Sequence, residues 1–244
     1  MNNTNEQRIR LNSKRPMSKE IKEKKKVLKR DTYETLKALY YSGKVKPSLN
    51  KILVELENDS KNLELSLLAC QCFERTKNFD ELSSYADVSI KLAPKIAGGY
   101  YYKGVAFQHT KGKEQEALKN FNEALTLDPD NTVYLKSKAV THLLLYTDYH
   151  LPIKFAEKHR VKAEESLLKI IELIEQKGNS DYIDFWTIGD VSIMLSRNLE
   201  AKKYFIKAVN AFNTSDKSKQ DINIYKDIIK AQKACIKLME KFTE

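Results

Sequence analysis

The chain has 244 residues, of which 41% are hydrophobic and 31% charged, and it carries a formal net charge of +10. Seven glycines and five prolines are too few for the many turns of an all-β protein. No stretch approaches the roughly 18 consecutive apolar residues of a membrane-spanning helix, which excludes that class. The N-terminus lacks the apolar stretch of a secretory signal, so we expect a cytoplasmic protein.

The positive charge is concentrated at the N-terminus. Residues 1–30 contain eleven basic and three acidic side chains, whereas the remaining 214 residues contain 32 basic and 30 acidic ones. We therefore predict a basic, flexible arm over 1–30 and a nearly neutral folded body over 31–244. Two interpretations of the arm stay open, a solvated leader and a contact with phosphates or an acidic surface. The contact would use Lys24, Lys25, Lys26, Lys29 and Arg30.

The body begins with two helical pairs. Residues 31–62 are predicted to form a degenerate pair, with helices over 31–42 and 47–60. Residues 63–96 are predicted to form a second pair. Its second helix has a row of small or apolar residues and a closing proline, at steps of four, three and five: Leu82, Ala86, Ser89 and Pro94.

The same steps return in residues 97–130. Small residues at two of these positions let two helices approach closely, the aromatic residue fills the gap, and the proline ends the pair. The positions are Ala117, Phe121, Ala124 and Pro129, and the first helix of this pair has Tyr100, Gly104 and Phe107 on one face.

The next unit, residues 131–181, is predicted to be irregular. Tyr134 opens its first helix in register, but the connection to the second helix is about ten residues too long for a repeat of this length. We expect an extended second helix over 152–176 and a protruding loop over 146–152. The loop is either a contact element or a tolerated insertion.

The chain closes with one more pair and a cap. Residues 182–215 have Ala201, Phe205 and Ala208 at the steps of the earlier pairs. Residues 220–242 are predicted to form one amphipathic helix that covers the exposed face of the last pair, as terminal caps do.

This pattern resembles the tetratricopeptide repeat (TPR) family, whose signature is W-x2-L-G-x2-Y…A-x3-F…P. Tyr100 stands at the tryptophan position, Lys103 replaces the leucine, and Gly104 and Phe107 match the glycine and the aromatic residue. The resemblance implies an all-α fold, a right-handed α-solenoid of TPR-like helix hairpins. The first helices of the pairs then line a concave groove.

The groove is the candidate binding site. Tyr101, Tyr102 and Trp186 are its natural anchors, since aromatic residues dominate binding hot spots, although packing between repeats is an equal alternative for Tyr102 and Trp186. Some TPR proteins hold an acidic C-terminus with a clamp of basic residues, and this chain departs from that pattern, because only Lys136 is basic at the comparable places. The residues expected to face the groove are Gln71, Tyr101, Tyr102, Val105, Gln108, His109, Leu135, Trp186, Asp190 and Ile193.

The sequence offers no catalytic pattern. The four histidines have no metal-binding spacing, the three cysteines do not suggest a disulfide framework, and nucleotide-binding and hydrolase motifs are absent. We expect a protein that is not an enzyme and needs no metal or cofactor. The leading hypothesis is a scaffold or adaptor that binds a protein or peptide in its groove. Nucleic-acid binding through the arm and a regulatory subunit of an enzyme are alternatives, and a homo-oligomer stays open.

Overall fold

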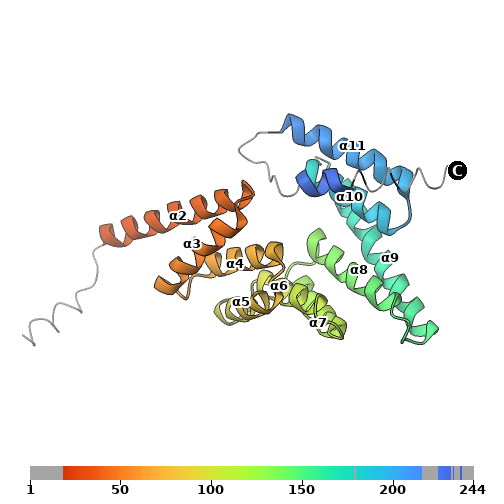
Figure 1. Ribbon diagram of the computed structural model, residues 1–244, viewed down its shortest axis with the longest axis horizontal. Coiled ribbons are helices and arrows are strands. Elements are labelled where there is room, and N and C mark those ends of the chain that lie inside the picture. The colour runs from red at the N-terminus through yellow and green to blue at the C-terminus, as the bar shows by residue number, and fades with distance from the viewer. Residues whose placement is uncertain (1–18, 179, 216–224, 232, 234–236, 238–244) are drawn as a thin grey trace, which may run out of the picture.

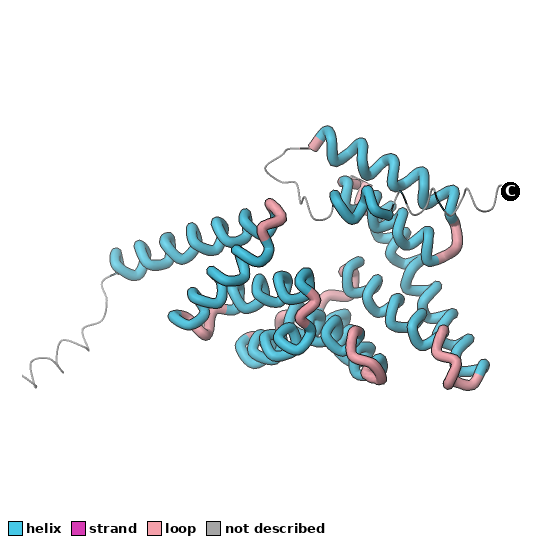
Figure 2. Tube along the Cα trace, viewed as in Figure 1, coloured by secondary structure: helices cyan, strands magenta, loops and turns pink. Residues whose placement is uncertain are grey.

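The computed structural model describes residues 19–178, 180–215, 225–231, 233 and 237, with side chains from Arg30 onward. Helices dominate the described part of the chain, joined by short loops (Figure 2). The helices are α2 (Lys19–Tyr41), α3 (Val45–Asn58), α4 (Leu63–Thr76), α5 (Phe79–Leu92), α6 (Ala97–Gln108), α7 (Glu114–Leu127), α8 (Thr132–Tyr146), α9 (Ile153–Gln176), α10 (Tyr182–Met194) and α11 (Asn198–Thr214).

Each helix packs against its neighbours in the chain, and the pairs follow one another along an arc from α2 to α11 (Figure 1). Contacts between alternate helices join α2 to α4, α4 to α6, and α6 to α8. These first helices of successive pairs therefore form one continuous layer, as expected for a solenoid of helix hairpins. None of the described helices has the length and apolar content needed to cross a membrane.

Side-chain caps fix where several helices begin. The carboxamide oxygens of Asn62, Asn78 and Asn131 accept hydrogen bonds from backbone N–H groups in the first turns of α4, α5 and α8. At α10, Asp181 and Asp184 form a reciprocal capping box. Such caps satisfy donors that the helix itself leaves unpaired. They fix the start of α4, α8 and α10, which are first helices of their pairs.

A glycine facing a phenylalanine holds two of the hairpins together. A methyl group built on Gly104 would lie 2.6 Å from the Phe121 ring, and one built on Gly189 would lie 2.7 Å from the Phe205 ring. Both rings are fully buried. The first helix therefore needs a residue without a side chain where the second helix inserts its ring.

In the hairpin α4–α5, other residues occupy the positions of this glycine and phenylalanine. Cys70 stands at the glycine position and Ala86 at the phenylalanine position, and both are fully buried. A larger residue on the first helix is thus matched by a smaller one on the second, which keeps the space between the helices filled.

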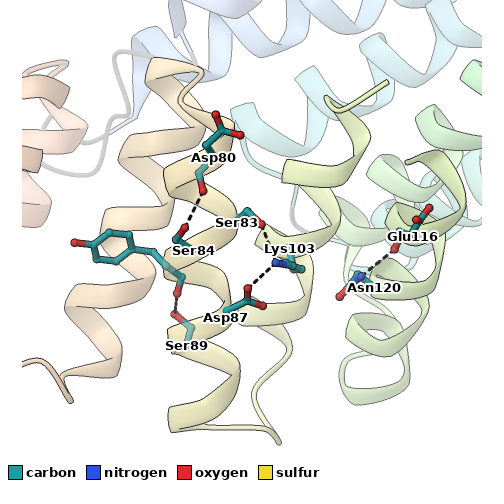
Figure 3. A network of polar contacts seen from close by, with 9 residues as sticks. Asp80, Ser83, Ser84, Asp87, Ser89, Lys103, Glu116 and Asn120 are labelled. Carbon is teal, nitrogen blue, oxygen red and sulfur yellow. Dashed lines mark hydrogen bonds and ion pairs between the residues drawn. The ribbon is translucent and has the colours of Figure 1, made fainter. Parts of the chain in front are cut away.

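Lys103, at the signature's leucine position, packs against the preceding hairpin. Its ammonium group donates to Ser83 Oγ at 2.7 Å and to Asp87 Oδ2 at 2.6 Å, both on α5 (Figure 3). The same group lies 5.0 Å from the centre of the Phe107 ring. Its side chain is only 15% exposed. The substitution therefore replaces an apolar contact between hairpins with a paired charge.

The observed helices can be compared with the boundaries predicted for the arm, the long helix and the cap. Helix α2 is continuous from Lys19 to Tyr41 and so crosses residue 30, where we placed the end of the arm. Residues 1–18 lie outside the described residues. Helix α9 begins at Ile153 and ends at Gln176, after a loop at 147–152. Within the predicted cap at 220–242, residues 225–231 are helical, and Ile228 is buried against Tyr182 and Phe212 of the last hairpin.

Candidate functional site

The concave face contains a cavity of about 1030 Å³. It is bordered by α2, α4, α6, α8 and α10 and by the helical residues 225–231. Four residues predicted to face the groove line it, namely Gln71, Tyr101, Tyr102 and Trp186. The other lining residues are Tyr40, Tyr41, Leu67, Glu74, Arg75, Lys77, Ile96, Gly98, Asn131, Val133, Tyr134, Lys136, Ser137, Ile183, Thr187 and Asp227.

Tyrosine rings form the floor of this groove. Tyr101 and Tyr102 are each only 8% exposed and belong to the main hydrophobic core. The Tyr101 ring centre lies 4.9 Å from that of Tyr134 on the next hairpin and 6.1 Å from that of Phe121. Burial raises the pKa of both Tyr101 and Tyr102 well above the ordinary value. Both residues therefore support the fold as well as the groove surface.

Glu74 adds an acidic side chain to this floor, at a position that we did not predict from the sequence. The Tyr101 hydroxyl donates to Glu74 Oε1 at 3.4 Å. Burial raises the pKa of the Glu74 carboxyl to about 7, against the lowering effects of Tyr101 and Arg75. Glu74 lies three residues after Gln71, on the same helix face, so helical spacing alone could have placed it here.

A second polar cluster lies on the opposite wall. The Lys136 ammonium pairs with Asp190 Oδ2 at 2.5 Å and lies 4.4 Å from the centre of the Trp186 ring. A cation over an indole face is a favourable arrangement that also fixes the ring. The charge of Lys136 is thereby compensated inside the protein, and part of the Trp186 surface stays open to the groove.

A salt bridge closes one side of the groove. Arg75 Nη1 on α4 lies 2.6 Å from Asp227 Oδ2, which is 152 residues further along the chain. The salt bridge links α4 to residues 225–231, which pack on the last hairpin, and so it connects the two sides of the groove.

We expect Asp227→Asn to loosen this closure with little effect on overall stability. The two side chains are 33% and 40% exposed, and exposed pairs contribute about 0–1 kcal/mol. Hydrogen exchange of residues 225–231 should nevertheless become faster, because a contact that holds this segment across the groove is lost. Lys113→Ala, which removes the exposed pair of Lys113 with Glu116 at the start of α7, is the control and should leave that exchange unchanged. Unchanged exchange in Asp227→Asn would show that the pair does not hold the segment.

The remaining predicted groove residues do not line this cavity. Val105 and Leu135 are buried in the core. The Gln108 amide donates to Ser137 O and Thr141 Oγ1 and so joins α6 to α8. The others make separate contacts: His109 stacks on Phe79, Asp190 pairs with Lys136, and Ile193 packs against the cluster of Ala201 and Phe205.

The residues of the predicted basic cluster lie in the first half of α2. The side chains of Lys24, Lys25, Lys26 and Lys29 lie outside the described residues, and Arg30 is exposed. Among the residues that the structure describes, His, Cys, Asp and Glu form no group of three that could hold a metal ion. Cys70 and Cys72 are buried free thiols.

The arrangement of the helices is that of known repeat proteins. A thermophilic TPR protein of Thermus thermophilus, TTC0263, superimposes with a TM-score of 0.61 at 16% identity, over 83% of this chain and 97% of that one. The chain has the tetratricopeptide-repeat fold. The TPR solenoid also matches a chain of the Cut9–Hcn1 hetero-tetramer of the APC/C, with a TM-score of 0.50 at 15% identity, over 79% of this chain and 36% of that one. MamA from Desulfovibrio magneticus RS-1 gives a TM-score of 0.47 at 12% identity, covering 77% and 96%.

These similarities are structural only. No protein-family model matches the sequence, and no curated protein matches it significantly. The fold predicted from the repeat steps is thus confirmed by structure, whereas the role of the groove is a separate question.

Proposed function

We propose that the TPR solenoid is a non-catalytic scaffold or adaptor that binds a segment of a partner protein in its concave groove. The observation that carries the proposal is the cavity of about 1030 Å³, floored by tyrosines and walled by Trp186. Its size and its mixture of aromatic surface with a few polar groups are typical of binding sites. The proposal includes a reducing compartment such as the cytoplasm, where free thiols like those of Cys70 and Cys72 are usual.

The charges of the groove favour one kind of segment. Arg75 is paired with Asp227, and Lys136 is paired with Asp190. Glu74 forms no salt bridge with any described residue, and its carboxyl lies beside the tyrosine floor. A partner with apolar side chains for the aromatic wall and one Lys or Arg for Glu74 would satisfy both features. An acidic segment would meet an uncompensated carboxylate.

A peptide-display selection against the immobilised full chain tests this proposal. Enriched peptides should combine apolar residues with a basic one. Their affinity should fall at least about tenfold with Trp186→Ala, as expected for an aromatic anchor. Glu74→Gln should weaken only the peptides that carry a basic residue. Phe155→Ala, which removes an aromatic side chain that is 60% exposed on α9, is the matched control.

Helical circular dichroism of each variant shows whether the fold is retained. Peptides that bind the Trp186→Ala and Glu74→Gln variants as tightly as the unchanged protein would rule out the groove. Recovery of acidic peptides alone would contradict the charge argument. Binding that disappears when Lys24, Lys25, Lys26, Lys29 and Arg30 are changed to Gln, and not with the groove variants, would instead support the basic arm and the nucleic-acid alternative.

A further inference from the structure

A second cavity, of about 600 Å³, lies between α7, α8 and α9, and the concave groove shares no lining residue with it. Two histidines meet at its wall. His142 Nδ1 on α8 lies 2.9 Å from His159 Nδ1 on α9. Since both rings use the same nitrogen, one is the donor and the other the acceptor when the pair is neutral. The groove-binding proposal makes no use of this cluster.

Three lysines line the same cavity as the histidine pair, one from each helix. Lys119, Lys138 and Lys162 line the cavity, and each forms no salt bridge with any described residue. Glu123 and Glu165 line it too, and they likewise form no salt bridge there. The lining of the cavity thus contains three lysines, two glutamates and two histidines, with no salt bridge among them.

The charged side chains that line the cavity are three lysines and two glutamates, so positive charge is in excess by one. Burial, together with the nearby His159, Lys162 and Lys138, lowers the pKa of His142 to about 4. Burial and the nearby Lys162 and Lys158 lower the pKa of His159. The pKa of Lys138 is lowered by burial and by Lys162, although Glu165 opposes the shift. Lys119 and Lys162 are exposed, whereas Lys138 is partly buried, and an anion in the cavity would offset the cost of burying the Lys138 charge.

We propose that this cavity is a binding site for a small oxyanion of two or more negative charges, of the phosphate class. The three lysines, one on each helix, supply the positive charge, and Gln115, Asn122 and Ser166 add hydrogen-bonding groups to the lining of the cavity. Binding of the anion favours uptake of one proton at the free Nε2 of the ring that donates from Nδ1, which keeps the Nδ1–Nδ1 hydrogen bond and leaves each ring with an Nε2–H. Anion binding is therefore coupled to proton uptake and becomes stronger as the pH falls.

A metal ion is the rival occupant, because two converging imidazole nitrogens can also chelate a transition metal. Two features disfavour it. The three lysines repel a cation, and no third His, Cys, Asp or Glu completes a metal-binding group in the described part of the chain. The anion is therefore the occupant that the charges favour.

Isothermal titration of the full chain with sodium sulfate tests the proposal, since sulfate keeps its charge between about pH 5 and pH 8 and isolates the protonation of the protein. We expect saturable binding that tightens at least about tenfold from about pH 8 to about pH 6, with net proton uptake measured in buffers of different ionisation enthalpy. Inorganic phosphate and pyrophosphate should compete for the same site.

Lys138→Met and Lys162→Met should each weaken sulfate binding at least about tenfold, because each removes one charge and keeps the apolar stem. Lys154→Met, an exposed position on α9 outside the cavity, should have no effect. Absence of saturable binding, or equal weakening in Lys154→Met, overturns the proposal. Saturable Zn²⁺ binding that sulfate does not affect also overturns it and assigns the pair to a metal. None of these outcomes depends on the concave groove.

Discussion

Replacing Phe121 with alanine is expected to lower the free energy of unfolding by about 3–5 kcal/mol. The Phe121 ring is fully buried and fills the gap that Gly104 leaves open on α6. Its loss removes the main contact between α6 and α7 and leaves a cavity there. Because each hairpin contacts mainly its neighbours, exchange protection should fall first in α6 and α7 and less in α10 and α11. Urea unfolding and hydrogen exchange measure the two effects.

A double-mutant cycle with Gly104→Ala shows whether the close approach is the cause. In the unchanged protein the new methyl group would meet the ring at 2.6 Å, so Gly104→Ala should destabilise. In the Phe121→Ala background the space is free, and the same change should be neutral or stabilising, since alanine favours helices by about 1 kcal/mol over glycine. Additive effects would contradict the proposed contact. Phe155→Ala, at a ring that is 60% exposed, should change stability by less than about 0.5 kcal/mol.

The buried residues on the second helix of each pair could be predicted from the sequence. Their spacing follows the period of the helix, and the helix that they pack against is a direct neighbour in the chain. The residues predicted on the second-helix rows of the three regular pairs, apart from the closing prolines, are at most 1% exposed: Leu82, Ala86, Ser89, Ala117, Phe121, Ala124, Ala201, Phe205 and Ala208. The sequence also showed Lys103 at the leucine position of the signature, but it did not predict the ion pair of Lys103 with Asp87 on the preceding hairpin.

The groove was harder to predict, because its surface depends on residues that are distant in sequence. Tyr101 was expected to face the groove as an anchor, and it lines the cavity, yet it is only 8% exposed, since Tyr134 of the next hairpin packs against its ring. An alanine at Tyr101 would therefore disturb the core as well as the groove. Glu74 and Trp186 are less buried, although Trp186 also packs against the hydrophobic clusters of the last hairpin. The pairing of Arg75 with Asp227 arises only from the curvature of the solenoid.

The contribution of Glu74 to the stability of the protein is expected to fall as the pH rises from about 4.5 to about 7, and Glu74→Gln should remove it. Glu74 has an ordinary pKa of 4.5, which burial raises to about 7 in the folded protein. In that interval the folded state keeps a proton that the unfolded state has released, so raising the pH favours unfolding; above about pH 7 the effect is constant. Because Glu74 keeps some exposure, we expect a total of about 1–2 kcal/mol.

The difference between the pH profiles of the unchanged protein and Glu74→Gln, measured by urea unfolding, isolates this carboxyl from the histidines. Glu116→Gln is the control, because the pKa of Glu116 is lowered by Lys113 and its profile should change in the opposite direction. A flat difference profile for Glu74→Gln would contradict the raised pKa.

The raised pKa of Glu74 also predicts how peptide binding in the groove depends on pH. A Lys or Arg placed beside Glu74 favours the ionised carboxylate and so lowers its pKa. Below about pH 7 binding must then release the proton that Glu74 holds, and affinity for basic peptides should rise as the pH increases towards neutrality. Glu74→Gln should abolish this pH dependence while leaving the contribution of Trp186 intact. A pH dependence that persists in Glu74→Gln would place the responsible group elsewhere in the groove.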